Sequence, residues 1–189
     1  MDAIGKGSGF LGMMLGSLFG AGSRRIDGRN PVDWASLPLP ALSGGTHDPA
    51  LFAGKAVLAV NVASRCVFTG QYKALEALWQ ARREHGLAVL GIPANDFFNQ
   101  EPGDAQQIQR FCAARGVDFP LLAKQRVTGP DAHPLYRWAE AEGGRAAVPR
   151  WNFHKLLIGR DGRLKGAFTS AVPAGSKRLL QAIDDALAE

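Results

Sequence analysis

Cysteine is scarce in this chain of 189 residues, which contains only Cys66 and Cys112. Two cysteines cannot form the disulfide framework of a small secreted scaffold, although they can form one redox pair or remain reduced in a cytosol. The Cys-x-x-Cys spacing of dithiol oxidoreductases is missing. None of the four histidines stands at a metal-ligand spacing from a cysteine. We therefore expect neither a metal site nor a bound cofactor.

Long apolar runs are also lacking. The longest at the N-terminus, Phe10 to Ala21, is shorter than the roughly 20 residues that cross a bilayer. Lys6 and the small residues that follow the run are typical of a signal peptide, whereas Asp2 is not. We predict an N-terminal tail over residues 1–35 that is disordered, a signal or membrane-associating. We expect a cytoplasmic protein, with export or membrane association through residues 1–22 as the alternative.

A basic stripe interleaved with aromatic residues is the third missing feature. The net charge of +5 is moderate and scattered, and aromatic residues make up 8% of the chain. Nucleic-acid binding needs a clustered basic footprint, so we expect no nucleic-acid partner. The positive surface is better suited to anionic thiols or acidic partners.

The stretch around Cys66 organises the chain. A continuous apolar run, Ala56 to Val62, predicts a buried strand that leads to this cysteine, and a helix begins four residues later. The helix dipole and Arg65 would both favour the thiolate, which is the reactive form. The alternative is that Cys66 is a small buried hydrophobe. The helix shows apolar positions at helical spacing: Tyr72, Leu75, Leu78 and Trp79.

The remaining elements predict an α/β protein. Leu87 to Ile92 reads as a second buried strand, and strand–helix–strand order favours a parallel pair. Asp161-Gly162 lies between two further apolar runs and predicts a hairpin. Helices are expected over residues 104–115, residues 133–142 and at the C-terminus. We predict a thioredoxin-like fold over residues 36–189, with a central mixed β-sheet flanked by helices.

Five short motifs resemble the glutathione peroxidase family, in family order over roughly residues 36–187. They are Asn61 to Cys66, Asn99 to Gly103, Phe119 to Lys124, His133 to Tyr136 and Trp151 to Lys155. The resemblance implies that Cys66 is the peroxidatic residue and that Gln100, Trp151 and Asn152 surround it. Indole and amide N–H groups can donate to the sulfur and to the peroxide oxygens without adding a titrating group.

The resemblance further implies a thiol peroxidase that reduces hydrogen peroxide and organic hydroperoxides through a sulfenic acid on Cys66. Cys112 resembles the resolving cysteine of thioredoxin-dependent members, so we expect an internal disulfide that thioredoxin reduces. A disulfide needs α-carbons within about 7 Å, so the helix carrying Cys112 would have to unwind. The connection from Trp138 to Trp151 is short and lacks the longer insertion that tetrameric family members use for assembly, so the resemblance implies a monomer.

Other interpretations stay open. Cys112 can be a core residue, which leaves a one-cysteine peroxidase that uses glutathione. Alternatively, the domain is a non-catalytic redox sensor or a binding module. A cysteine hydrolase would need His154, beside Asn152, as the base for Cys66.

The chain also departs from the family pattern. Val67 replaces a glycine, Gly70 replaces a proline, and residues 96–99 are bulkier than the family version. These departures would alter the peroxide pocket.

Overall fold

One mixed sheet forms the centre of the computed structural model, which describes residues 22–189. The predicted apolar segment at residues 10–21 lies outside the described residues. In order along the described chain, the strands are β1 (Ser23–Arg25), β2 (Ala56–Val62), β3 (Leu87–Pro93), β4 (Lys155–Ile158) and β5 (Leu164–Phe168). Their order in the sheet is β1-β5-β4-β2-β3.

The strand pairing explains why the sheet is mixed. β2 and β3 pair in parallel, as their connection through a helix predicts, and every residue in both is buried. β4 pairs antiparallel with β2 on one side and with β5 on the other. Gly162, with φ +77°, forms the turn between β4 and β5, which confirms the predicted hairpin.

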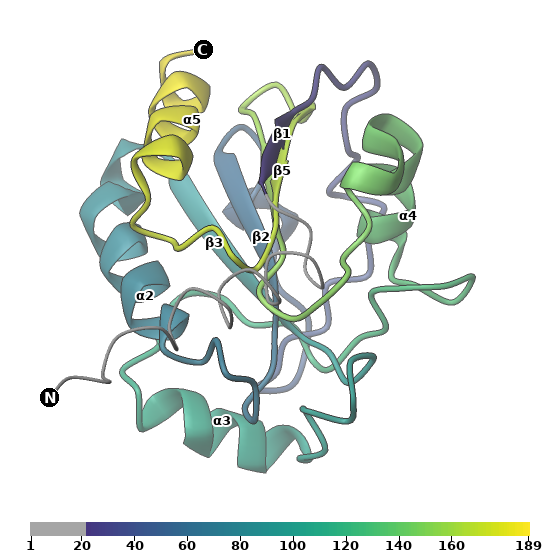
Figure 1. Ribbon diagram of the computed structural model, residues 1–189, viewed down its shortest axis with the longest axis vertical. Coiled ribbons are helices and arrows are strands. Elements are labelled where there is room, and N and C mark those ends of the chain that lie inside the picture. Colours follow the sequence, from purple (N-terminus) through teal and green to yellow (C-terminus); the bar gives the residue numbers. More distant parts are fainter. Residues whose placement is uncertain (1–21) are drawn as a thin grey trace, which may run out of the picture.

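Helices cover both faces of the sheet (Figure 1). α2 (Gln71–Arg82) and α5 (Lys177–Ala188) lie on one face, and α4 (Pro134–Gly143) lies on the other. Alternation along β2 sends Leu58 and Val60 into the core beneath α2 and α5, and Val57 and Ala59 into the core beneath α4. Three short 3-10 turns complete the elements: η1 (Pro49–Leu51), η2 (Arg83–His85) and η3 (Gly144–Ala146).

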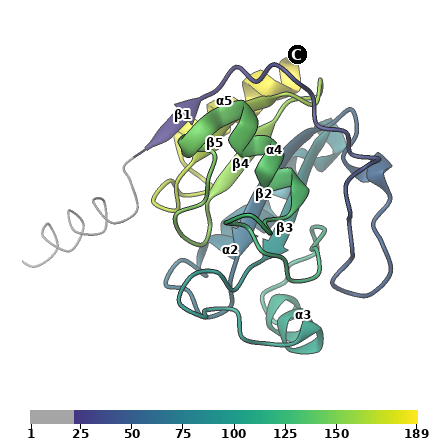
Figure 2. The ribbon, with the colours of Figure 1, turned by 90° about the vertical axis from the view of Figure 1, so that its right-hand side faces the viewer.

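α3 (Ala105–Ala113) stands apart from this sandwich, beyond one end of the sheet (Figure 2). Its start is the predicted one, since Asp104 and Gln107 form a capping box. Two buried side chains, Ile108 and Cys112, hold its inner face. A helix of this length depends on such packing and capping, because short helices are marginal on their own.

The predicted tail boundary at residue 35 is too late. β1 pairs antiparallel with the edge of β5, and Trp34 is buried with its ring centroid 5.1 Å from that of Phe52. Ser-Arg-Arg carries no apolar alternation, so its strand state arises from the edge hydrogen bonds of β5 and not from local sequence. Within residues 22–189, no helix has the length and apolar character needed to cross a membrane.

Candidate functional site

Cys66 lies in the loop between β2 and α2, as predicted. Its side chain is almost completely buried, and the Phe68 backbone N–H donates to Sγ at 3.5 Å. The Thr69 backbone N–H donates to the Cys66 carbonyl at 3.1 Å, which closes a turn around the sulfur. The loop therefore holds Sγ against backbone donors before any neighbouring segment contributes.

Trp151 and Asn152 reach the same sulfur from the segment that precedes β4. The side chains of both residues lie close enough to Cys66 to act on its pKa, and both lower it. Buried Asn61 at the end of β2 fixes this segment, because its Nδ2 donates to the Trp151 carbonyl at 3.1 Å and its carbonyl accepts from the Phe153 N–H at 2.6 Å. The segment is thus tied to the strand that presents Cys66.

Phe153 adopts a left-handed backbone conformation, with φ +66°. Such a conformation costs a non-glycine residue about 1–3 kcal/mol, and it persists only where the surroundings enforce it. The surroundings here are the Asn61 hydrogen bond and the fully buried Phe153 ring, whose centroid lies 5.3 Å from that of Tyr72. This bend lets Asn152 face the sulfur while the Phe153 ring enters the core.

Gln100 joins the site through Asn152. Asn152 Nδ2 donates to Gln100 Oε1 at 2.9 Å, and the Gln100 carbonyl accepts from the Arg65 N–H at 3.0 Å. Phe98 and Asn99 have left-handed φ values of +51° and +54°, which bring the loop back toward Cys66. The structure therefore brings together four of the five predicted site residues.

The pKa of the Cys66 thiol is raised, so the expected bias toward the thiolate is wrong for this state. Burial is the largest cause and raises the pKa, while hydrogen bonds from Phe68, Trp151, Asn152 and Val67 lower it less. Desolvation disfavours the charged sulfur more than these neutral donors favour it. Arg65 is exposed to solvent and is not among the causes of the shift.

Cys112, the fifth predicted residue, lies on the inner face of α3. It is buried in the same core cluster as Cys66, and both cysteines are free. Burial raises its pKa to about 11, while the nearby Tyr72 side chain acts to lower it. Cys112 is therefore a protonated thiol that lies near Tyr72 of α2 and is not bonded to Cys66.

Sequence reasoning missed Glu101, which ties the two loops together. Its carboxylate is buried and accepts from the Ser64 N–H at 2.8 Å and the Ser64 Oγ at 3.0 Å. Burial raises the pKa of this carboxyl, and the Ser64 bonds act in the opposite direction. The Lys124 ammonium donates to the Glu101 carbonyl at 3.1 Å. Glu101 thereby sets the spacing between the Gln100 loop and the Cys66 loop.

Lys155 was also missed. The first residue of β4, it is fully buried, and Nζ donates to the Phe153 carbonyl at 2.8 Å. Burial lowers its pKa to about 7. A lysine at the start of an apolar run does not reveal that its side chain is buried. The only signal for Lys155 in the sequence was its place at the end of the Trp151 to Lys155 motif.

Residues that depart from the family pattern, Val67 and the bulky residues 97 and 98, form an apolar rim beside the site. Phe97 and Phe98 pack on Trp151 with ring centroids at 6.0 and 5.3 Å. Phe98 is 82% exposed and Val67 is 77% exposed. Large apolar side chains this exposed are the kind that mark a contact surface for an apolar molecule.

His154 does not serve Cys66. A strand running through residues 153–158 would place Asn152 and His154 on one face, but β4 begins at Lys155 and the Phe153 bend breaks the alternation. His154 is buried in a separate cavity lined also by Arg150. Its pKa is lowered to about 3 by burial, Lys155 and Arg150, with no contribution from Cys66. The nucleophile–base contact that a hydrolase needs is missing from the described residues.

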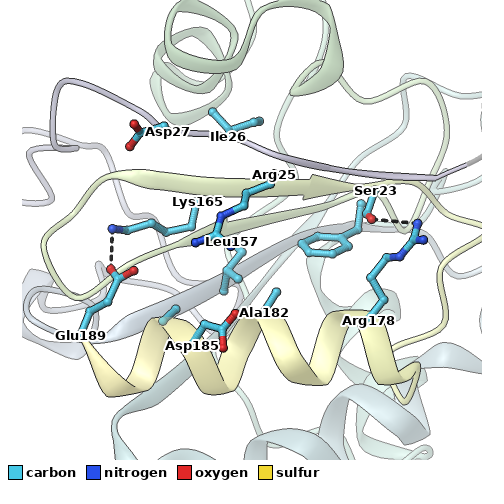
Figure 3. A pocket seen from close by; sticks show the side chains of 12 residues that line it. Ser23, Arg25, Ile26, Asp27, Leu157, Lys165, Arg178, Ala182, Asp185 and Glu189 are labelled. Carbon is cyan, nitrogen blue, oxygen red and sulfur yellow. Dashed lines mark hydrogen bonds and ion pairs between the residues drawn. The ribbon is translucent and has the colours of Figure 1, made fainter.

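A cavity of about 540 Å³ lies between α5 and strands β1 and β5 (Figure 3). Two of its basic side chains have partners within the cavity: Lys165 pairs with Glu189, and Arg178 donates to the Ser23 hydroxyl at 3.2 Å. None of the five predicted site residues lines it. Its size alone does not make it the reactive site.

Comparisons with known proteins agree with the sequence motifs. The family model described as "Glutathione peroxidase" matches residues 41–140. The glutathione peroxidase-like peroxiredoxin GPX5 of Chlamydomonas reinhardtii is 42% identical over 149 residues, 77% of this chain and 91% of that protein. The hydroperoxy fatty acid reductase Gpx2 of Synechocystis is 42% identical over 156 residues, 80% of this chain and 99% of that protein.

Solved structures support the fold. The apo crystal structure of Trgpx has a TM-score of 0.64 and 34% identity, over 84% of this chain and 97% of that chain. A DsbF homologue from Corynebacterium diphtheriae has a TM-score of 0.65 at 18% identity, over 88% of this chain and 94% of that chain. The predicted thioredoxin-like α/β fold is confirmed.

Proposed function

This chain belongs to the glutathione peroxidase family, and on that premise we propose that it reduces hydroperoxides at Cys66 with electrons from thiols. The observation that carries the proposal is the convergence of Trp151, Asn152 and the Phe68 N–H on one buried sulfur. Neutral donors around a cysteine suit a reaction in which negative charge moves from sulfur to oxygen.

The first step forms a sulfur–oxygen bond. A sulfur electron pair attacks the terminal peroxide oxygen, the O–O bond breaks, and the bonding pair leaves with the other oxygen. That oxygen takes the thiol proton and departs as an alcohol or water, while Cys66 becomes a sulfenic acid. Burial raises the pKa of Cys66, so its proton must be transferred during the reaction, and the departing oxygen is the group that accepts it.

The donors supply their stabilisation where the charge develops. Removal of one fixed donor from an oxyanion site typically costs about 3 kcal/mol of barrier. Trp151 and Asn152 each supply one such group to Cys66, and Gln100 is held beside them by Asn152. These residues need no titration of their own to act at neutral pH.

The second step uses Cys112 as the resolving thiol. Its sulfur attacks the Cys66 sulfenic acid, water leaves, and an intramolecular disulfide forms. Cys112 is buried on α3, so the step requires α3 to open. Support for opening comes from the helix itself, which is nine residues long and lies beyond the end of the sheet (Figure 2).

Thioredoxin is the proposed reductant, and the proposed active form is a monomer. A dithiol reductant attacks the Cys66–Cys112 disulfide, returns both thiols and leaves with a disulfide of its own. A one-cysteine cycle with glutathione is the competing version and needs no movement of α3. Exposed Phe98 and Val67 beside the site favour organic hydroperoxides with an apolar chain.

Intact mass under non-reducing conditions tests the cycle. Wild type and Cys112→Ser each receive one equivalent of hydrogen peroxide. We expect the wild type to lose two hydrogen atoms, with the change mapped to a peptide that joins Cys66 and Cys112, and the variant to gain oxygen on Cys66. Oxygen on Cys66 of the wild type without a disulfide would leave the glutathione version. No change at Cys66 in either protein would refute the peroxidase proposal.

A further inference from the structure

A second polar cavity lies behind the reactive segment, on the α4 face of the sheet. It has a volume of about 190 Å³ and an open mouth continuous with a wider surface hollow, since both share Arg24, Arg145 and Arg150. These three arginines are exposed to solvent, and they come from β1, η3 and the segment before Trp151. Three segments that are distant in the sequence therefore each place one arginine at the same cavity mouth.

The arginines have no acidic partner in the part of the chain that the structure describes. The cavity lining contains no aspartate or glutamate, and none of the three guanidinium groups forms an ion pair within residues 22–189. The Figure 3 cavity differs, because there Lys165 pairs with Glu189. Like charges held together without a counter-charge favour the binding of an anion.

The inner wall of the cavity carries two polar atoms that lack partners. His154 Nε2 and Thr169 Oγ1 are both buried and have no hydrogen-bond partner among the described residues. The His154 side chain is only 4% exposed, and both residues line the cavity. Buried polar groups in native structures are nearly always satisfied, so an unpaired pair at the end of an open cavity points to a ligand.

The sheet register explains how these residues meet. Arg24 of β1 pairs with Ala167 of β5, and Lys155 of β4 pairs with Phe168. His154 precedes Lys155 and Thr169 follows Phe168, so both side chains lie on the face opposite the side chain of Lys155. The Thr169 N–H also donates to the Gly22 carbonyl at 3.2 Å, which extends the β1 pairing to the cavity.

We propose that this cavity binds a phosphate-type oxyanion, held by Arg24, Arg145 and Arg150 at the mouth and by His154 and Thr169 inside. Guanidinium groups match oxyanions with paired N–H donors, and the imidazole N–H and the hydroxyl add neutral donors. A volume of about 190 Å³ equals about six waters, which accommodates one tetrahedral oxyanion with part of its hydration shell. Burial, Lys155 and Arg150 all keep the pKa of His154 low, so it offers the anion a neutral imidazole at pH 7.

The cavity is separate from the peroxide site but shares a segment with it. Arg150 and His154 flank Trp151 and Asn152, the residues that donate to Cys66. A bound anion would therefore restrain both ends of the segment that surrounds the sulfur. The binding test itself needs no peroxide, so its outcome is independent of the proposed activity.

Inorganic phosphate is the probe, titrated calorimetrically into the reduced full-length protein at constant ionic strength with chloride as the reference salt. Arg24→Gln and Arg145→Gln are the test variants, and Arg25→Gln is the matched control. Arg25 is the next residue in β1 and lines the Figure 3 cavity, so the control removes the same charge from the opposite face. We expect phosphate affinity to fall about tenfold in each test variant and by less than about twofold in the control.

Thr169→Val keeps the side-chain shape and tests the interior, with an expected loss of about fivefold. A phosphate-dependent shift of the His154 imidazole resonance in the wild type would place the anion inside. Equal weakening by Arg24→Gln and Arg25→Gln, or no saturable binding above the chloride reference, would overturn the proposal.

Vesicles of phosphatidylcholine with and without phosphatidic acid identify the source of the anion. Binding that needs phosphatidic acid, is displaced by phosphate and is weakened by Arg24→Gln but not by Arg25→Gln would assign the site to a lipid headgroup. Phosphate binding without vesicle binding would assign it to a free oxyanion. Vesicle binding unaffected by phosphate and by Arg24→Gln, with no phosphate binding, would count against the cavity.

Discussion

Replacement of Trp151 by phenylalanine is the sharpest test of the donor arrangement around Cys66. The change removes the indole N–H, which acts to lower the pKa of Cys66, but keeps an aromatic ring against Phe97 and Phe98, whose centroids lie at 6.0 and 5.3 Å. A hydrogen bond to a charged group contributes about 1.5–3 kcal/mol. Since one pKa unit corresponds to about 1.4 kcal/mol, we expect the pKa of Cys66 to rise by about 1 to 2. The rate of peroxide reduction at pH 7 should then fall about 10- to 100-fold.

The assay combines two measurements in a Cys112→Ser background, where Cys66 is the sole thiol. The pH dependence of alkylation gives the pKa of Cys66, and stopped-flow oxidation gives the second-order rate constant with hydrogen peroxide. Trp138→Phe is the control, because the Trp138 indole donates to the Asn30 carbonyl at 3.2 Å and not to the site. If Trp151→Phe matches Trp138→Phe in both quantities, the reasoning about the indole donor is refuted.

Three further predictions concern residues around the site. Burial lowers the pKa of Lys155 to about 7, so above that pH the unfolded chain binds more protons at this residue than the folded chain, and stability rises with pH. In urea denaturation between pH 7 and about pH 8.5, the free energy of unfolding of the wild type should rise by about 1 kcal/mol per pH unit relative to that of Lys155→Met. Parallel pH dependences of the two proteins would contradict this. Phe98→Gly removes exposed apolar surface beside Trp151, so kcat/KM for a fatty acid hydroperoxide should fall about fivefold relative to hydrogen peroxide, whereas an unchanged ratio would exclude a rim contact. Asp104→Ala deletes the cap on the Gln107 N–H and destabilises α3 by about 1 kcal/mol; disulfide formation, followed by quenched mass spectrometry, should accelerate about fivefold, and a slower rate would argue against opening of α3.

Much of the architecture follows from short-range pattern. β2 and β3 are continuous apolar runs, and the Asp104–Gln107 capping box and the Asp161-Gly162 turn are local signals, so each is readable without a tertiary context. β1 is not, because Ser-Arg-Arg becomes a strand only through hydrogen bonds to β5, a partner far along the chain.

The site divides in the same way. Motif order identified Cys66, Gln100, Trp151 and Asn152, and the structure places them together. The direction of the Cys66 pKa shift was wrong because it depends on how deeply the loop is buried, which the helix dipole argument ignores. Burial of Lys155 escaped prediction for the same reason, since solvent exposure is a property of the folded packing.

The left-handed backbone of Phe153 has a consequence for how this protein can vary. The bend turns Asn152 and His154, the residues before and after Phe153, to different sides. The Asn152 side chain therefore acts on the Cys66 thiol, whereas the His154 side chain lines the arginine cavity. Point substitutions on one side can therefore accumulate with little effect on the other. An inserted or deleted residue anywhere from 151 to 154 would instead shift both sides at once, so this stretch should tolerate changes of side chain far better than changes of length.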